Sequence, residues 1–422
     1  MTRLGYGFGR GARGPANARP EALWRLATVR AGESAYGIGN VSTSNSARTS
    51  GRIRDMLSNA HMTALRYADA AFIIGSDQAE TAVSPQSIQR ALEIGPAVGR
   101  VTWSGSAIGT IPGGALLWSD DLLPGALGLS EFPPGAMVWH RSMKDNLVGD
   151  TRANFPMTGP GTPEGEDQRG TTIGVDRLMQ TGALPADGGA RAQIDGAPGV
   201  LIGLAKDHGP TVLVGGDSRF YGVSGNAGPG TGTAGGPPRM ALEQAGIPHA
   251  MQARSGSKIQ DFVAGDFAKP VLRIGIIAYV SDILCNWSVN DMSNGRTASQ
   301  ILGDIAALVA KAKAINPQVR IWWTTMAPST NGSNIPVGLY ANSANDGRQA
   351  FNNEIRTNFA AYGLSGLVDI SAAVEDPTQT DRWADFANDS SDGLHSRQTG
   401  QAKEAAVIKA WADALPAPLA AY

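Results

Sequence analysis

The sequence has a single cysteine, Cys285, and only five histidines among its 422 residues. One cysteine excludes both an internal disulfide and a zinc cluster built on several cysteines. The longest apolar stretch, Val271 to Val280, contains Arg273 and is far shorter than the roughly 20 residues of a membrane-spanning helix. We therefore expect no helical membrane span and no cysteine-based metal site.

The sequence also lacks an excess of positive or negative charge. The 35 Lys and Arg residues nearly balance the 37 Asp and Glu residues, which gives a net charge of −2. Such a chain has no overall field to attract nucleic acid or an anionic membrane, so neither is an expected partner. His61, His208 and His249 show no metal-ligand spacing with carboxylates. Neither a metal nor another cofactor is implied.

Glycine, by contrast, is abundant. The 54 glycines are about 13% of the chain against a usual ~7%, which favours long loops and β turns over a helical bundle. Hydrophobic residues make up 42% and charged residues 17%, as in globular proteins with a core to bury. At roughly 100–200 residues per domain, the length predicts two or three domains.

Residues 1–55 form the first predicted region, an extended Arg- and Gly-rich arm. Its first 54 residues contain nine Arg, no Lys and only two acidic residues. An Arg-rich, acid-poor leader can be a transit peptide, but the apolar core of a secretory signal is missing, so signal-driven export is not expected and no compartment is assigned. A Gly-rich arm cannot order itself alone. Either it lies on its own domain, or residues 1–54 dock into a homo-oligomer or a larger assembly.

Residues 56–206 form the second region, predicted to be a β-sandwich-like accessory domain. Short apolar runs at 70–75, 100–103, 115–118 and 136–140 are separated by Pro-Gly and Gly-Gly turn signals. The Gly-, Pro- and Asp-rich segment 157–200 predicts extended loop with few strands.

Residues 207–422 form the third region, in which predicted strands and helices alternate. This order indicates an α/β fold, with a parallel sheet covered by helices on both faces. Ligand sites in such sheets lie at the carboxyl ends of the strands. The chemistry is therefore expected in the segments that directly follow strands.

The first predicted strand of this region runs into a Gly-Gly-Asp-Ser turn that ends at Ser218. A serine placed after a buried strand and flanked by glycine is how an α/β fold exposes a nucleophile. A hydroxyl needs an adjacent base to act as one. Taken alone, the turn favours a plain helix start capped by Asp217 and Ser218.

The candidate base is His395, which follows Asp392 just before the last predicted helix. The Asp-x-x-His spacing can fold the carboxylate back onto the imidazole within one turn. Asp392 would then fix the tautomer and leave the other ring nitrogen for Ser218. The alternative is a capping Asp beside a surface His.

Two further segments carry candidate oxyanion donors. Gly256 can present a backbone N–H, and Asn290 a side-chain amide. Asn286 is a rival to Asn290, but it falls within the strand pattern. The alternative interpretation is an ordinary turn glycine and a helix-capping Asn.

Together, the GDS of 216–218, a glycine after the next helix, the Asn-Asp pair at 290–291 and the DGLH of 392–395 resemble the SGNH (GDSL) hydrolase superfamily, in order and spacing, across about 210 residues. The resemblance implies a three-layer hydrolase domain over 207–422. It implies Ser218 as nucleophile, His395 as general base and Asp392 as its orienting carboxylate. The oxyanion hole would comprise the N–H groups of Ser218 and Gly256 and the Asn290 side chain.

The sequence departs from the family pattern at Ser288, where the family usually has glycine, which predicts a narrower oxyanion pocket. The Gly-rich segment 224–238 is also unusual and is expected to form a lid or a subsite loop. The expected function is a serine esterase that removes acyl groups, O-acetyl above all, from polysaccharide. The alternative is a structural or glycan-binding subunit of an assembly such as a phage tail or baseplate, which would make the protein virion-associated or extracellular.

Overall fold

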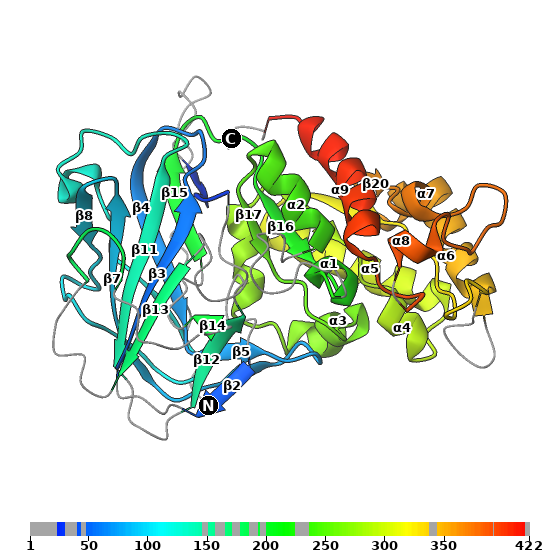
Figure 1. Cartoon of the computed structure of the whole chain (residues 1–422), viewed down its shortest axis with the longest axis horizontal. Coiled ribbons are helices and arrows are strands. Elements are labelled where there is room, and N and C mark those ends of the chain that lie inside the picture. The colour runs from blue at the N-terminus through cyan, green and yellow to red at the C-terminus, as the bar shows by residue number, and fades with distance from the viewer. Residues whose placement is uncertain are drawn as a thin grey trace.

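The computed structural model describes the following residues: 23–29, 40–43, 48–145, 151–156, 165–170, 178–184, 193–194, 200–223, 236–336, 344–390 and 392–417. Two parts lie side by side, a β part that ends with β15 and an α/β part that begins with β16 (Figure 1). This order confirms the predicted fold class, an α/β part with a parallel sheet preceded by antiparallel sheets.

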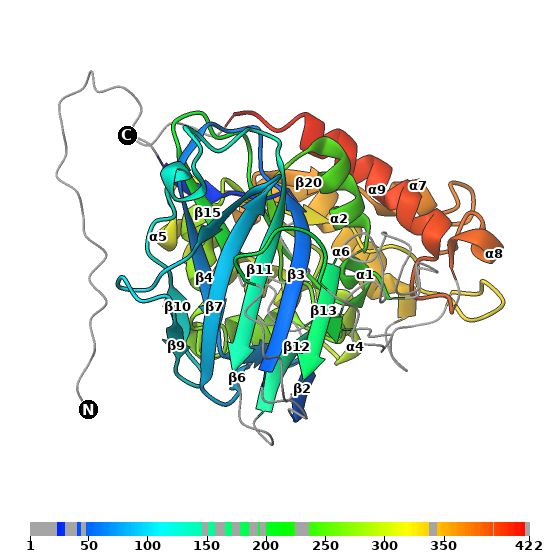
Figure 2. The same cartoon turned by 60° about the vertical axis from the view of Figure 1, so that its left-hand side comes forward.

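Two larger antiparallel sheets build the β part. The first has the order β13 (Gly165–Gly170), β3 (Arg48–Met56), β11 (Met137–Asp145), β7 (Gln86–Ile94) and β8 (Ala97–Arg100), with β9 (Gly109–Ile111) also paired to β7 (Figure 2). The second has the order β1 (Leu23–Leu26), β15 (Val200–Ala205), β4 (Met62–Ala70) and β10 (Leu116–Trp118).

These two sheets share one apolar core. Leu65 and Tyr67 of β4 lie in the same buried cluster as Ile88 and Leu92 of β7 and Val138 of β11. Alternating residues of a strand point to opposite faces, so each sheet contributes one face to this cluster. The remaining elements of the β part are β2 (Asn40–Thr43), β12 (Thr151–Pro156), β14 (Gln193–Ile194), the hairpin β5 (Phe72–Ile74) and β6 (Glu80–Ala82), and the 3-10 helix η1 (Pro124–Leu127).

The α/β part is centred on a parallel sheet. Its strand order is β17 (His249–Met251), β16 (Val212–Gly215), β18 (Asp282–Cys285), β19 (Arg320–Thr324) and β20 (Gly366–Val368). All residues of β16 and β18 are buried, as expected of central strands covered on both faces. Because every pairing is parallel, the carboxyl ends of these strands lie at one edge of the sheet.

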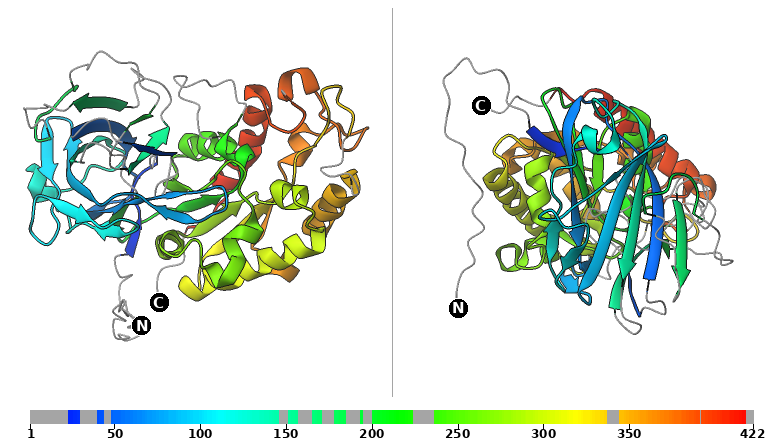
Figure 3. Two further views of the ribbon diagram at one scale, coloured as in Figure 1. Left: turned by 90° about the horizontal axis from the view of Figure 1, so that it is seen from below. Right: turned by 90° about the vertical axis from the view of Figure 1, so that its left-hand side faces the viewer.

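Helices cover both faces of this sheet (Figure 3). The elements that follow β16 are α1 (Ser218–Tyr221), α2 (Gly236–Ala245), α3 (Ile259–Phe267), η2 (Arg273–Tyr279), α4 (Val289–Ser293), α5 (Ala298–Ile315), α6 (Ala344–Asn358), η3 (Phe359–Tyr362), α7 (Ser371–Val374), α8 (Phe386–Asp389) and α9 (Gln398–Asp413). One buried cluster contains side chains of α2 and α9, and another contains side chains of α3, α5 and α6. None of the helices in the described ranges is both long and apolar enough to cross a membrane.

The β part and the α/β part pack on each other through a shared apolar core. Leu26 of β1, Phe72 of β5 and Ile202 of β15 belong to the same buried cluster as Ile276 and Ile277 of η2. The ring centroids of Trp118 and Tyr279 lie 5.4 Å apart across this boundary. The second sheet is thus buried on its outer face by the α/β part.

The arm predicted over 1–55 differs from the structure in the described residues from Leu23 onward. β1 pairs with β15 and β3 pairs with β11, so these segments are strands of the two large sheets. Arginines of these strands make hydrogen bonds within the protein. Arg52 donates to Glu93 over two 3.0 Å hydrogen bonds, and Arg25 donates to the Ala278 carbonyl over 3.2 Å. The sequence pattern failed here because buried ion pairs let arginine occupy strands. Residues 1–22 lie outside the described ranges.

Two other expectations concern loops. The segment 157–200, expected to be mainly loop, contributes β13 and β14, and its last residue begins β15. Of the Gly-rich segment 224–238, residues 224–235 lie outside the described ranges, and residues 236–238 begin α2. Its role as a lid stays a prediction.

Candidate active site

Ser218 lies where β16 ends, at the carboxyl edge of the parallel sheet. The strand stops at Gly215, and Ser218 is the first residue of α1. Asp217 caps this short helix, because its carboxylate accepts the Arg219 N–H over 3.0 Å. The capping interpretation of the turn is therefore correct for Asp217, and it leaves the Ser218 hydroxyl available for chemistry.

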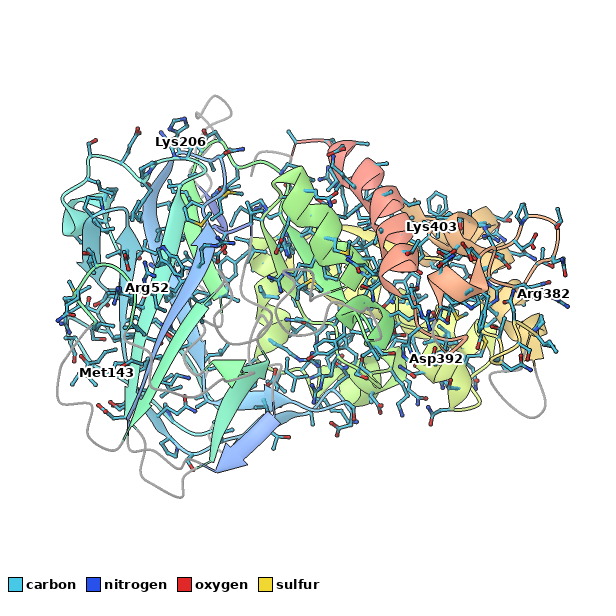
Figure 4. All side chains as sticks on the ribbon, in the orientation of Figure 1. Arg52, Met143, Lys206, Arg382, Asp392 and Lys403 are labelled. Carbon is cyan, nitrogen blue, oxygen red and sulfur yellow. The ribbon has the colours of Figure 1, made fainter. Side chains whose placement is uncertain are left out.

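The structure brings Ser218, His395 and Asp392 together in one hydrogen-bonded chain. His395 Nε2 lies 2.9 Å from Ser218 Oγ, and His395 Nδ1 lies 2.7 Å from Asp392 Oδ2. Asp392 and His395 come from the loop before α9, where Figure 4 labels Asp392. The same three residue types in this order form the relay of serine hydrolases.

The loop itself fixes the Asp392 carboxylate. Its Oδ1 accepts the backbone N–H groups of Leu394 over 2.9 Å and His395 over 2.7 Å. Burial raises the pKa of Asp392, but the hydrogen bonds from the His395 ring and from these two N–H groups outweigh it and hold the pKa below its ordinary value. The carboxylate is thus ionised and oriented toward the imidazole at neutral pH.

Asn286, the rival to Asn290 as an oxyanion donor, contacts the turn before Ser218 instead. Gly215 pairs with Cys285, so the residues that follow β16 and β18 meet at the sheet edge. The Asn286 side-chain oxygen accepts the Asp217 N–H over 3.1 Å. A Cβ at Gly216 would lie 2.1 Å from this oxygen, so only glycine fits there. Asn286 holds the turn that presents Ser218, a positioning role that the sequence pattern did not reveal.

Gly256 lies on the loop after β17, on the other side of β16. Its φ of +78° is in the left-handed region, which favours glycine. The loop is tied to the nucleophile turn, because the Ser257 hydroxyl donates to the Gly216 carbonyl over 2.6 Å and the Arg254 N–H donates to it over 2.9 Å. Within the described ranges, the N–H groups of Ser218 and Gly256 have no hydrogen-bond acceptor, so both remain free for an oxyanion.

Asn290 belongs to α4 and contacts the Gly256 loop. Its side-chain amide donates to the Ser257 carbonyl over 3.1 Å, which uses one of its two N–H bonds. The neighbouring Asp291 carboxylate accepts the N–H groups of Ile259 and Gln260, over 3.1 and 2.9 Å, and so anchors α4 to the start of α3. The structure therefore brings Asn290 to the loop of Gly256.

Ser288, which departs from the family pattern, is buried before α4. Its hydroxyl donates to the Asn286 carbonyl over 3.4 Å, and its φ of 172° is ordinary extended backbone. The hydroxyl is thus directed to the backbone of its own loop, and the narrower oxyanion pocket stays a prediction.

Behind the triad lies a buried group of charges that the sequence did not predict. Arg219 donates to the carbonyls of Ala327 and Pro328, over 3.0 and 3.1 Å, and so connects α1 to the segment after β19. Glu404 of α9 accepts the Ser396 hydroxyl over 2.8 Å. Burial lowers the pKa of Arg219 and raises that of Glu404 to about 7.

Glu404 predicts a pH-dependent stability. Because its folded pKa is raised, the folded protein keeps a proton that the unfolded chain has lost, and stability falls as pH rises from the ordinary Glu pKa to about 7. Glu404→Gln keeps an acceptor for Ser396 without the titration. We expect the free energy of unfolding of this variant, relative to that of the wild type, to be higher at pH 8 than at pH 4 by roughly 1–3 kcal/mol. Thermal or denaturant unfolding at both pH values measures it, and equal gains at both would contradict the assignment.

The remaining candidates lie outside this site. His140 is buried in the β part, with Nδ1 2.9 Å from the Tyr67 hydroxyl and Nε2 3.1 Å from Asp55. Cys285 is buried in β18, and burial raises the pKa of its thiol above the ordinary range. In the part of the chain that the structure describes, no three His, Cys, Asp or Glu side chains gather as a metal site would require.

No protein-family model matches the chain, and neither does any curated protein. Among solved structures, a family-two carbohydrate esterase from Clostridium thermocellum is 11% identical, with 93% of this chain and 97% of that chain covered and a TM-score of 0.36. A protein described as lipolytic, of the G-D-S-L family, from Desulfitobacterium hafniense is 11% identical over 48% of this chain and 98% of its own, with a TM-score of 0.36.

A lipase from a goat rumen metagenome is 13% identical, with 48% of this chain and 96% of that chain covered and a TM-score of 0.37. Such identities and TM-scores assign neither a substrate nor an activity to this chain. Over about half of its length, the chain is similar to solved structures of the GDSL and SGNH hydrolase kind.

Proposed function

We propose that the protein is a serine esterase that hydrolyses acyl esters through an acyl-enzyme on Ser218. The single observation that carries this proposal is the hydrogen-bonded chain from Ser218 Oγ to His395 Nε2, at 2.9 Å, and from His395 Nδ1 to Asp392, at 2.7 Å. A nucleophile, a base within hydrogen-bond distance and an oriented carboxylate are the components that acyl transfer to serine requires.

The reaction has two halves. In the first, Ser218 Oγ attacks the ester carbonyl while His395 Nε2 takes its proton, and the ionised Asp392 stabilises the resulting imidazolium. His395 then gives this proton to the departing alcohol, which leaves the acyl group on Ser218. In the second half, His395 deprotonates a water that attacks the acyl-enzyme, and as that intermediate collapses His395 returns the proton to Ser218 Oγ, which releases the acid and restores Ser218.

The negatively charged oxygen of each tetrahedral intermediate must be stabilised by hydrogen-bond donors. In this proposal they are the free N–H groups of Ser218 and Gly256 and the Asn290 side-chain amide. The hydrogen bonds of Asn290 to Ser257, and of Ser257 to Gly216, hold the donor-bearing loops in place before substrate arrives. Donors fixed in advance stabilise developing charge without reorganising at the moment of reaction.

Replacement of Asn290 by alanine tests this part of the proposal. Loss of one preorganised donor is expected to lower kcat by about 10²–10³-fold and to change KM little. The measurement is steady-state hydrolysis of p-nitrophenyl acetate, with Asn358→Ala as a matched control, since Asn358 is an exposed asparagine at the end of α6. If the two variants lose the same activity, Asn290 is not an oxyanion donor.

For the substrate, we propose O-acetyl groups on polysaccharide. The support is chemical: within the described ranges, exposed large hydrophobic side chains are few and scattered, which does not suit a surface for long acyl chains. The test is acetate release from a panel of acetylated polysaccharides, beside p-nitrophenyl esters of increasing chain length. Faster hydrolysis of long-chain esters than of every acetylated glycan would contradict this substrate.

A further inference from the structure

The loop of the β5–β6 hairpin extends from the β part to the α/β part, where it lies near α3 (Figure 1). The loop comprises residues 75–79, with Gly75 and Gln78 joined by a 3.0 Å backbone hydrogen bond. It hydrogen-bonds to Lys269 and Arg273, which lie 192 and 195 positions away from their partners in the chain. The tip of the hairpin, residues 75–79, is therefore a part of the β part that contacts the α/β part.

Several hydrogen bonds fix the hairpin to the segment between α3 and η2. The Glu80 carboxylate accepts the backbone N–H groups of Leu272 and Arg273, over 3.0 and 2.8 Å. The Arg273 guanidinium donates to the backbone and side-chain oxygens of Gln78, over 2.9 and 2.6 Å. Lys269 donates to the Asp77 carbonyl over 2.9 Å. The tip is therefore attached to the α/β part as well as to its own strands.

The buried partners make this attachment costly to break. Gln78 and Arg273 are both 0% exposed, and Arg273 lies over the Phe262 ring at 4.9 Å. This burial lowers the pKa of Arg273 to about 9. Withdrawing the hairpin would strip a buried charge of its acceptors. The position of the tip is thus a fixed property of the folded protein.

The fixed tip lies against the proposed oxyanion loop. A Cβ built on Gly256 would lie 3.4 Å from Cβ of Ser76, which is ordinary contact distance. Ser76, Asp77 and Gly256 are all exposed, so they share a surface open to solvent. A substrate whose carbonyl oxygen binds at the Gly256 N–H therefore has Ser76 as a neighbour, and Asp77 is the next residue of the same loop.

We propose that Ser76 and Asp77, at the tip of the β5–β6 hairpin, form one wall of the substrate site and select esters whose alcohol part carries further hydroxyl groups. The inference rests on the proposed function of Ser218. A hydroxyl and a carboxylate offer hydrogen bonds to a sugar, whereas an apolar chain laid against them would remove water from both, although Asp77 would keep its 3.1 Å hydrogen bond from the Ala79 N–H. The β part would then determine specificity for chemistry performed in the α/β part.

The test compares Ser76→Ala and Ser76→Trp with the matched control Ser130→Trp, an exposed serine in the loop after η1 on the β part. The substrates are O-acetylated xylan and p-nitrophenyl acetate, which lacks sugar hydroxyls. We expect Ser76→Ala to lower kcat/KM for acetylated xylan by about 2–10-fold, the value of one hydrogen bond. Ser76→Trp should lower it further, while p-nitrophenyl acetate and the control variant change little.

Equal losses on both substrates, or no loss in Ser76→Trp, would overturn the inference while leaving the esterase intact. Failure of the proposed function looks different, because the wild type would then hydrolyse neither substrate and Ser218 would take no fluorophosphonate label. Wild-type hydrolysis of p-nitrophenyl acetate alone, with full labelling of Ser218, would overturn the choice of a hydroxyl-rich alcohol. Thermal unfolding of each variant shows whether the hairpin remains folded.

Discussion

Ser218→Ala is expected to lower kcat for ester hydrolysis by about 10⁶-fold, to the level of background. The substitution removes one oxygen from a side chain that is 6% exposed, and α1 keeps its cap because Asp217 supplies it. The Ser257 hydroxyl in the adjacent loop donates to the Gly216 carbonyl, so it is not free to replace Ser218 in the reaction. The loss should therefore be chemical, with little change in stability.

Acetate release and p-nitrophenyl acetate hydrolysis by wild type and variant measure this effect. Ser130→Ala, on the distant loop after η1, provides the matched control and should keep full activity. Circular dichroism and thermal unfolding verify that the Ser218→Ala protein is folded. A folded Ser218→Ala protein with more than about one hundredth of the wild-type kcat would show that the nucleophile lies elsewhere, since a triad serine contributes far more.

Asp392→Asn is expected to lower kcat by up to about 10⁴-fold at neutral pH. The asparagine oxygen can still accept the N–H groups of Leu394 and His395, so the loop should keep its shape. Its amide nitrogen, however, would face His395 Nδ1 and make that atom an acceptor. The proton then moves to Nε2, which can no longer take the Ser218 proton.

The pH profile of kcat/KM distinguishes this loss from general damage. In the variant, activity should recover in part at high pH, where hydroxide can take over the role of the base, whereas a distorted loop gives the same loss at every pH. Asp389→Asn is not a suitable control, because that carboxylate is buried against Lys403. Asp385→Asn, nearer the surface of the same segment, is the better match. Wild-type activity in Asp392→Asn would exclude Asp392 from the relay.

The placement of the site was predictable because the relevant motifs follow strands. The sequence around Ser218 comes directly after β16, and Asn286 directly after β18, and parallel pairing of Gly215 with Cys285 brings these segments together. The carboxyl ends of parallel strands meet at one edge, whatever the loops contain. The strand pattern therefore predicted the position of Ser218, whereas its grouping with Asp392 and His395, which precede α9, came from the family resemblance.

The other features of the site depend on tertiary contacts that no local sequence pattern encodes. Asn286 falls within a strand-like pattern, and only the register with β16 reveals that it holds the Asp217 N–H. The 3-residue strand β17 is too short to give a periodic signal. Ser76 lies 180 positions before Gly256, and the buried Arg273 that fixes its loop occurs in a run that otherwise suggests plain core. Tertiary packing determines the positions of Asn286, β17 and Ser76.

Covalent trapping tests the central claim most directly. The full-length protein is incubated with a fluorophosphonate, digested, and the modified peptide is sequenced by mass spectrometry, with Ser218→Ala and His395→Ala treated in parallel. We predict stoichiometric modification of Ser218 in the wild type, none in Ser218→Ala and much slower labelling in His395→Ala, because the base activates the nucleophile. Hydrolysis of p-nitrophenyl acetate by a protein whose Ser218 stays unmodified, or label on another residue, would contradict the account.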